Sequence, residues 1–228
     1  MLYPLHPKPN KKKPKQQYRT LEHASAVYKT LQDIYGEVSC PLHHKEPHEL
    51  AIAVILSAQC TDERVNQVTP KLFETFPTLE SFAKAKTKDL EKLIFSTGFY
   101  HNKTKSIIGF AKMVLENYGG KIPDNLPDAT KLPGFGRKTA NVVISELYRK
   151  NEGFVVDTHV KRLANRLGLV KFQDPIRIEK EIMAFVPSSW WRNLSLYLIF
   201  LGRQNCKARK PLCQSCPLLA ICPSSHAA

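Results

Sequence analysis

Three groups of residues in this 228-residue chain have types and spacings that could carry chemistry. Lys138 directly follows a glycine-rich segment, and a lysine amine can attack an electrophilic carbon when it is uncharged. Asp157 follows a short apolar run, where a carboxylate could move protons or stabilise a developing positive charge. Four of the six cysteines fall between positions 206 and 222, which predicts a metal centre in a reducing compartment.

The segment LPGFGRKTA at 132–140 predicts a tight turn followed at once by a helix. The first amides of such a helix have no partners within it and carry the positive end of its dipole. Gly134 and Gly136 let a phosphate approach the backbone, and the basic Arg137 follows directly. We favour a phosphate-binding helix–hairpin–helix motif over the alternative, a plain turn between two helices.

Lys138 falls in the first turn of this expected helix, and that position bears on its chemistry. A helix N-terminus disfavours a second positive charge, and burial would disfavour it further. The residue is therefore either a neutral amine nucleophile or, like most lysines near DNA, a phosphate contact. The local sequence does not decide between these two roles.

Asp157 stands where the N-cap of a helix is expected, and capping is the commoner role for such a residue. The functional alternative is a carboxylate that faces Lys138 across a cleft. Because an anion would favour the charged amine, its use there would be to move protons and to stabilise positive charge on a reacting sugar.

The cysteine spacing is Cys206-x6-Cys213-x2-Cys216-x5-Cys222. Structural zinc sites usually combine two close cysteine pairs, and this segment contains one. Four thiolates on a compact loop also suit a 4Fe–4S cluster, which the spacing favours over zinc. The six-residue gap contains three basic residues that could face a DNA backbone: Lys207, Arg209 and Lys210.

The net charge of +14 points to a polyanionic partner such as nucleic acid. Six of the basic residues lie among the first 20, which contain no acid, and we interpret residues 1–18 as a flexible basic arm. The rest of the surplus predicts that the folded part is basic as well. No apolar run approaches the ~20 residues of a membrane helix, and no signal peptide opens the chain, so we expect neither membrane spanning nor secretion.

Helical periodicity dominates from about residue 19, whereas alternating strand patterns are scarce. The stretch 50–56 is apolar on every side, as in a centrally buried helix. We expect an all-α fold with roughly ten helices of ordinary length. One helix would be capped by Thr87, one would begin at Asp174-Pro175, and one would occupy 193–202 and stop at Gly202.

These segments together resemble the endonuclease III family of DNA glycosylases. The resemblance rests on Leu56-Ser57-Ala58-Gln59, the segment 132–140, Val156-Asp157-Thr158-His159 and the four-cysteine loop, and it covers roughly residues 20–223. It implies two helical lobes with a DNA-binding cleft between them. Residues 40–151 would form a six-helix domain with the helix–hairpin–helix, and residues 19–39 plus 152–228 a helical domain with the iron–sulfur cluster loop.

The same resemblance implies a base-excision-repair DNA glycosylase with AP lyase activity. Lys138 would attack C1′ of an oxidised pyrimidine nucleotide flipped out of the duplex, with Asp157 as the essential carboxylate, and a Schiff base would allow β-elimination 3′ to the lesion. Gln59 and Phe99 would fill the gap, although bacterial relatives often have leucine in place of Phe99. The other implied DNA contacts are Leu132, Gly134, Gly136, Arg137, Thr139 and His159. The implied ligands of a 4Fe–4S cluster are Cys206, Cys213, Cys216 and Cys222.

The implied partner is double-stranded DNA with an oxidised pyrimidine or an abasic site, bound by a monomer in the bacterial cytoplasm and associated with the nucleoid. Two alternatives remain open from the sequence. A monofunctional mismatch glycosylase of the same superfamily would lack the lysine and activate water instead. A non-catalytic iron–sulfur protein that binds DNA would explain the charge and the cysteines, but would make the pairing of Lys138 and Asp157 a coincidence.

Overall fold

The computed structural model describes residues 19–225, and every regular element in that range is helical. The predicted all-α class is therefore confirmed, while the arm predicted at 1–18 lies outside the described residues. None of the helices between residues 19 and 225 is both long and apolar enough to cross a bilayer. The α-helices are α1 (Leu21–Tyr35), α2 (Pro47–Leu56), α3 (Asp62–Thr75), α4 (Leu79–Ala83), α5 (Thr87–Ile94), α6 (Tyr100–Tyr118), α7 (Leu126–Ala129), α8 (Arg137–Tyr148), α9 (Thr158–Arg166), α10 (Pro175–Met183) and α11 (Trp191–Gln204). Three short 3-10 helices accompany them: η1 (Phe95–Thr97), η2 (Ser188–Trp190) and η3 (Cys213–Ser215).

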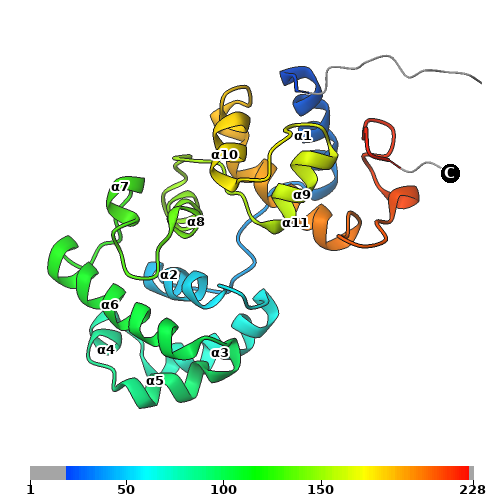
Figure 1. Cartoon of the computed structure of the whole chain (residues 1–228). Helices are drawn as coiled ribbons and strands as arrows, with labels where there is room; N and C mark the ends of the chain where they lie inside the picture. The colour runs from blue at the N-terminus through cyan, green and yellow to red at the C-terminus, as the bar shows by residue number, and fades with distance from the viewer. Residues whose placement is uncertain (1–18, 226–228) are drawn as a thin grey trace, which may run out of the picture.

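The buried hydrophobic side chains form two separate clusters. The first contains residues between Leu42 and Ile144 and is built by α2 to α8. The second combines residues 24–38 of the N-terminal part with residues 154–218, so that α1 packs with α9 to α11. Figure 1 shows the same arrangement, with α1 among the C-terminal helices and apart from α2 to α8. The predicted domain boundaries at 39/40 and 151/152 fall between these clusters, and the division into domains stays a prediction.

Helix α2 lies at the centre of the first cluster because its circumference is almost entirely apolar. All of its residues from Leu50 to Leu56 are buried, and each fully buried aliphatic side chain contributes about 1.5–3 kcal/mol. A capping box of Glu46 and Glu49, with Pro47 at the first helical position, fixes its start. The C-terminal end of α2, which precedes Gln59, is therefore anchored firmly in the core.

Two helix ends differ from those that the sequence predicts. The predicted stop at Gly202 is wrong, because α11 continues to Gln204. A Cβ at Gly202 would lie 2.8 Å from Nδ1 of His159, so the close approach of α11 to α9 is what requires this glycine.

The predicted cap at Thr87 is wrong as well, because Thr87 is the first residue of α5 and Lys86 occupies the N-cap position. At α10 the prediction is confirmed, since the side chain of Asp174 accepts a hydrogen bond from the backbone N–H of Arg177.

The segment between α8 and α9 approaches α10 so closely that it contains a glycine with no room for a side chain. Glu179 of α10 is 4% exposed and pairs with Arg137 of α8, with 2.7 Å between Oε2 and Nε. A Cβ at Gly153 would overlap Oε1 of Glu179 and lie 2.5 Å from Nδ2 of Asn141. The contact between α8 and α10 therefore depends on a bare backbone at position 153.

We predict that Gly153→Ala lowers the free energy of unfolding by about 1–3 kcal/mol, as overpacking a filled site does. Urea unfolding followed by far-ultraviolet circular dichroism measures the change. Gly136→Ala is the control for sterics, because a Cβ there meets no atom within 4 Å and the φ angle of −85° suits any residue. Its own loss is limited to the preference of an N-cap for glycine over alanine. A Gly153→Ala protein as stable as this control would contradict the packing described above.

Candidate active site and candidate metal centre

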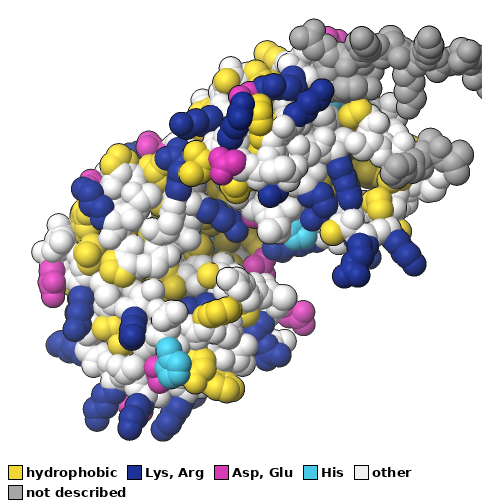
Figure 2. Space-filling view, viewed as in Figure 1, with side chains coloured by type: hydrophobic (Ala, Val, Ile, Leu, Met, Phe, Trp, Pro, Cys, Tyr) yellow, Lys and Arg dark blue, Asp and Glu magenta, His cyan; other side chains and the backbone are white. Residues whose placement is uncertain are grey.

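A cavity of about 230 Å³ lies where the two clusters meet, and both Lys138 and Asp157 line it. The first cluster contributes residues of α2, α8 and the loop that contains Gln59, while Asp157 and residues of α11 come from the second. Thr139, another predicted DNA contact, also lines the cavity. Figure 2 shows the surface hollowed between the two halves of the molecule. The structure thus places the predicted nucleophile and the predicted carboxylate on one opening with room for a nucleobase.

Helix α8 begins at Arg137, directly after the glycine-rich turn, as the sequence predicts. Its N-cap is Gly136, which has no side chain to cover the first amides, so these remain available to an anion. Gly134 has a φ of +82°, and a Cβ there would lie 2.9 Å from Cβ of Ser106 on α6. Lys138 sits in the first turn of α8, and its side chain is exposed and not buried.

Asp157 combines the two roles that the sequence left open. Its Oδ1 accepts a hydrogen bond from the backbone N–H of Val160 at 2.7 Å, which makes it the N-cap of α9. The residue is only partly buried and faces the same cavity as Lys138. Asp62 and Arg203 line this cavity too and form an ion pair of 2.8 Å across it, from α3 to α11. Capping therefore fixes the Asp157 carboxylate at the edge of a charged opening.

The two residues predicted to fill the gap in the DNA are exposed and share an unusual backbone. Gln59 has a φ of 53° and Phe99 a φ of 50°, both in the left-handed region, and the Phe99 side chain is 61% exposed. Together with Gly134 they line a second hollow beside the first. Leu132 differs from them, because its side chain is 2% exposed and belongs to the first cluster. Only its backbone is left for the DNA contact that the sequence predicts.

Arg137 and His159, which were also predicted to contact DNA, are engaged by the protein itself. Arg137 donates from Nε to Glu179, although its side chain is 46% exposed. Nδ1 of His159 lies 3.1 Å from Nη2 of Arg162, on the side that faces α11. Burial lowers the pKa of His159, which keeps its ring neutral at pH 7. Contact of these two residues with DNA stays a prediction.

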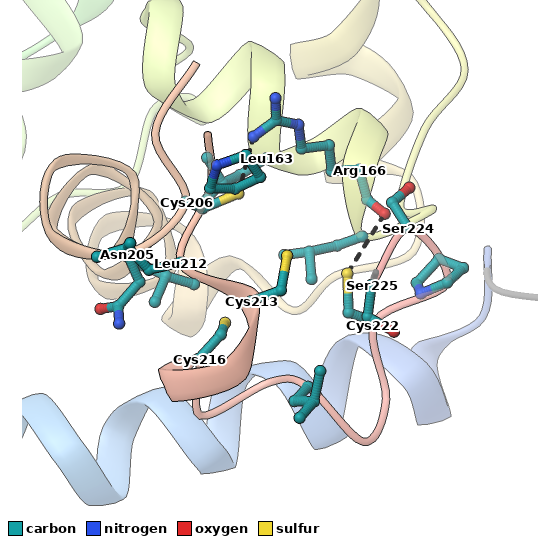
Figure 3. A pocket seen from close by; sticks show the side chains of 15 residues that line it. Leu163, Arg166, Asn205, Cys206, Leu212, Cys213, Cys216, Cys222, Ser224 and Ser225 are labelled. Atoms are coloured by element: carbon teal, nitrogen blue, oxygen red, sulfur yellow. Dashed lines mark hydrogen bonds between the residues drawn. The ribbon is translucent and has the colours of Figure 1, made fainter. Parts of the chain in front are cut away.

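The four cysteines of the C-terminal loop line one cavity of about 500 Å³ (Figure 3). Among residues 19–225, no three His, Cys, Asp or Glu side chains lie close enough together to hold a single metal ion. All four cysteines nevertheless line the same cavity. Four cysteine thiolates are the donors that a 4Fe–4S cluster takes, and the sequence contains one close cysteine pair where structural zinc sites usually combine two. The donor set and the cavity fit a 4Fe–4S cluster.

The cysteine cavity is closed on one side by α9. Arg166 donates to the carbonyl oxygens of Lys207 and Ala208, at 2.8 Å and 3.0 Å, and its Nη1 lies 3.3 Å from Sγ of Cys206. Burial raises the pKa of the Cys216 and Cys222 thiols, so thiolates there need compensating positive charge. The guanidinium of Arg166 lies against Sγ of Cys206, the first of the four cysteines.

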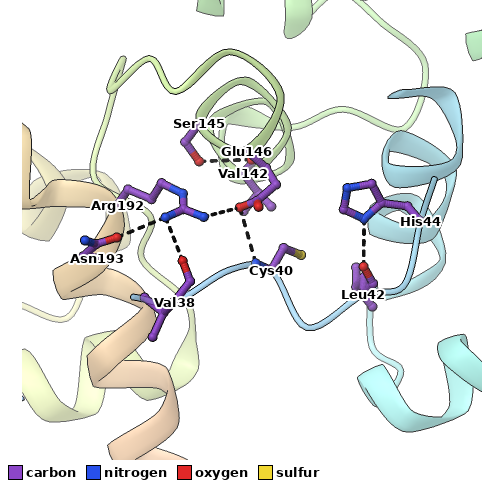
Figure 4. Close-up of polar contacts among 9 residues, drawn as sticks. All are labelled: Val38, Cys40, Leu42, His44, Val142, Ser145, Glu146, Arg192 and Asn193. Atoms are coloured by element: carbon purple, nitrogen blue, oxygen red, sulfur yellow. Dashed lines mark hydrogen bonds and ion pairs between the residues drawn. The ribbon is translucent and has the colours of Figure 1, made fainter. Parts of the chain in front are cut away.

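A largely buried ion pair joins α8 to α11 at the side of the cavity that Lys138 and Asp157 line (Figure 4). Oε2 of Glu146 lies 2.7 Å from Nη2 of Arg192, and both side chains are 10% exposed. Arg192 also donates to the carbonyl oxygen of Val38, and the N–H of Cys40 donates to Glu146. Because Cys40 and Val142 line the cavity, this network fixes one of its walls. No sequence signal points to it, since its partners lie far apart in the chain.

Comparisons with known proteins place the chain among DNA repair proteins. Residues 52–188 match the family described as HhH-GPD superfamily base excision DNA repair protein. Endonuclease III of Synechocystis sp. is 45% identical over 206 residues, which cover 90% of this chain and 94% of that protein. Endonuclease III of Bacillus subtilis is 44% identical over 191 residues, covering 83% of this chain and 87% of that protein.

Solved structures give the same relationship. A trapped covalent intermediate of endonuclease III with DNA, in an estranged-adenine complex, matches with a TM-score of 0.85 and 39% identity. The match covers 90% of this chain and 97% of that one. A thermostable thymine-DNA glycosylase shares the fold, with a TM-score of 0.78 at 22% identity over 91% of this chain and 97% of that one.

We predict that Arg192→Met lowers the free energy of unfolding by about 3–5 kcal/mol, because it leaves the buried carboxylate of Glu146 unpaired. The double variant Glu146→Met/Arg192→Met loses less, since no buried charge remains. Urea unfolding measures both. The control is Lys131→Met, which removes an exposed pair with Asp128 and changes stability by less than about 1 kcal/mol. If the double variant lost as much unfolding free energy as Arg192→Met and Glu146→Met do together, this account would be contradicted.

Proposed function

The chain belongs to the HhH-GPD superfamily of base excision DNA repair proteins and is a DNA glycosylase/AP lyase of the endonuclease III kind. From that premise we propose that it removes oxidised pyrimidines from double-stranded DNA through a lysine Schiff base, and that it cuts the strand 3′ to the lesion by β-elimination. The observation that carries the proposal is the single cavity lined by Lys138 and Asp157. A relative whose covalent DNA intermediate has been trapped supports the covalent step.

The proposed reaction begins once the damaged nucleotide has left the base stack and entered the cavity. The uncharged Nζ of Lys138 forms a bond to C1′, and the bond from C1′ to the base breaks with its electron pair leaving on the base. The carboxylate of Asp157 stabilises the positive charge that develops on the sugar and accepts a proton from the amine. The C1′–O4′ bond then breaks with its electron pair leaving on O4′, which takes up a proton, while the lysine nitrogen forms a protonated Schiff base with C1′. That cationic group makes the C2′ proton acidic; a base removes this proton, and the C3′–O bond breaks with the phosphate as leaving group.

The exposed start of α8 provides the proposed grip on the DNA backbone. Its uncovered amides, behind Gly134 and Gly136, bind a phosphate and so place the sugar beside Lys138. Lys and Arg side chains are spread over both halves of the face seen in Figure 2, which suits a polyanion bridging them. Gln59 and Phe99, exposed beside the cavity, fill the gap that the flipped nucleotide leaves.

We further propose that Cys206, Cys213, Cys216 and Cys222 hold a 4Fe–4S cluster. Such a cluster supplies four covalent cross-links to a loop with little core of its own, and it has the capacity for electron transfer. The loop exposes Lys207, Arg209 and Lys210, which face the DNA backbone in this proposal. We place the enzyme as a monomer on DNA in the bacterial cytoplasm, a location supported by its bacterial relatives.

We predict that Lys138→Ala abolishes borohydride trapping on duplex DNA carrying thymine glycol or an abasic site, because the imine can no longer form.

We predict that Asp157→Asn keeps the α9 cap, since asparagine caps as well as aspartate, yet slows base release by about 10²-fold or more. Urea unfolding tests the role of Asp157 as the cap of α9, which asparagine should preserve, whereas the rate of base release tests the proposed role of its carboxylate in the reaction. Base release without nicking by the unmodified enzyme would favour a monofunctional glycosylase, and binding without either reaction would favour a non-catalytic protein.

We predict that the purified protein absorbs broadly in the visible range and contains about four irons per chain. Cys213→Ser should lose both the absorbance and the iron. Cys40→Ser and Cys60→Ser are matched controls, because both residues line or adjoin the first cluster and lie outside the cysteine cavity. Stoichiometric zinc with no iron in protein purified without oxygen would contradict the cluster.

A further inference from the structure

Lys103 of α6 is a buried lysine that the proposed reaction does not use. It is 5% exposed, and burial lowers its pKa. Its Nζ donates two hydrogen bonds of 2.8 Å each, to the carbonyl oxygens of Leu56 and Thr97. A buried ammonium is costly unless hydrogen bonds compensate it, and here two backbone carbonyls do so.

The two carbonyls belong to different elements that both end at this point. Leu56 is the last residue of α2, and Thr97 is the last residue of η1. Carbonyls at helix ends lack partners within the helix, so a cation between them satisfies both and favours their dipoles. Lys103 therefore connects the ends of two elements that the sequence separates by about forty residues.

Each of these helix ends leads directly into a strained residue. Gln59 comes three positions after Leu56, and Phe99 comes two positions after Thr97. Both have positive φ angles, which non-glycine residues keep only where their surroundings hold them. The side chains of both are exposed, and they line one hollow together with Lys103. The ammonium thus lies where two loops begin, residues 57–61 after α2 and residues 98–99 after η1.

We propose that Lys103 is a positioning residue, which holds these two loops in a fixed relation so that Gln59 and Phe99 enter the DNA together. The inference rests on the proposed function, in which these side chains fill the gap left by the flipped nucleotide. A merely structural lysine would stabilise the fold without affecting duplex substrates in particular. The two roles therefore differ in which substrates a variant processes slowly.

The first test is Lys103→Met, which keeps the length of the side chain and removes its donors. Under single-turnover conditions, we expect base release from a thymine glycol duplex to slow by about tenfold or more, because the variant loses two buried hydrogen bonds and each is worth up to about that factor. Borohydride trapping on a single-stranded abasic oligonucleotide should keep the rate of the unmodified enzyme, because no gap needs filling there. Lys105→Met is the matched control, since Lys105 is exposed on the same helix. Equal slowing on both substrates would overturn the proposal.

A double-variant cycle with Phe99→Ala gives the second test. If Lys103 acts through the loops, Lys103→Met has little further effect on the duplex reaction once Phe99 is alanine. If Phe99→Ala slows base release from the duplex and Lys103→Met slows it further by its full factor, this inference is overturned and the proposed function stays intact. If Phe99→Ala does not slow base release at all, both the gap-filling role and this inference are overturned. Lys138→Ala tests the reaction separately. If Lys103→Met fails to fold, Lys103→Gln enters the same cycle, because its amide can still donate to one carbonyl.

Discussion

The proposed catalytic pair depends on the contact between two hydrophobic clusters that do not share a core. Lys138 belongs to α8 in the first cluster, and Asp157 begins α9 in the second. Charged pairs connect the two sides: Glu146 with Arg192, Arg137 with Glu179, and Asp62 with Arg203. Only in the pair of Glu146 with Arg192 are both side chains as little as 10% exposed, so the loss of either partner would leave a largely buried charge unpaired between α8 and α11.

The two helix starts at the cavity use the same backbone geometry in opposite ways. At α9 the cap is Asp157, whose side chain accepts a hydrogen bond from the amide of Val160 and is thereby held at the cavity edge. At α8 the cap is Gly136, which has no side chain to accept hydrogen bonds from the first amides and leaves them available to an external anion. In the proposed function, one start holds the reactive carboxylate and the other binds the substrate backbone, so that a phosphate at α8 would bring its sugar toward Asp157.

The features that sequence predicts correctly are local ones. The turn before Lys138, the caps at Asp157 and Asp174 and the helix at α2 each depend on neighbouring residues, and each is present. Features that depend on distant partners were not predictable. Lys103 reaches a carbonyl 47 positions away, and Glu146 pairs with a residue 46 positions away. The same limit explains two predictions that differ from the structure. Gly202 is required by the close approach of His159 and does not end α11, and the side chain of Leu132 is buried in the core.

Helix α9 links the cysteine loop to the active site, although the two cavities are separate. Asp157 caps its first turn, while Arg162 and Arg166 farther along the helix donate to carbonyls of the loop, namely those of Cys206 and Lys207. An α-helix of nine residues is stiff, so a displacement at its C-terminal end moves its N-cap as well. A cluster that fixes the loop therefore also fixes the orientation of α9. The proposed cluster, which takes no part in the proposed bond changes, would in this way still determine where the carboxylate of Asp157 lies relative to Lys138.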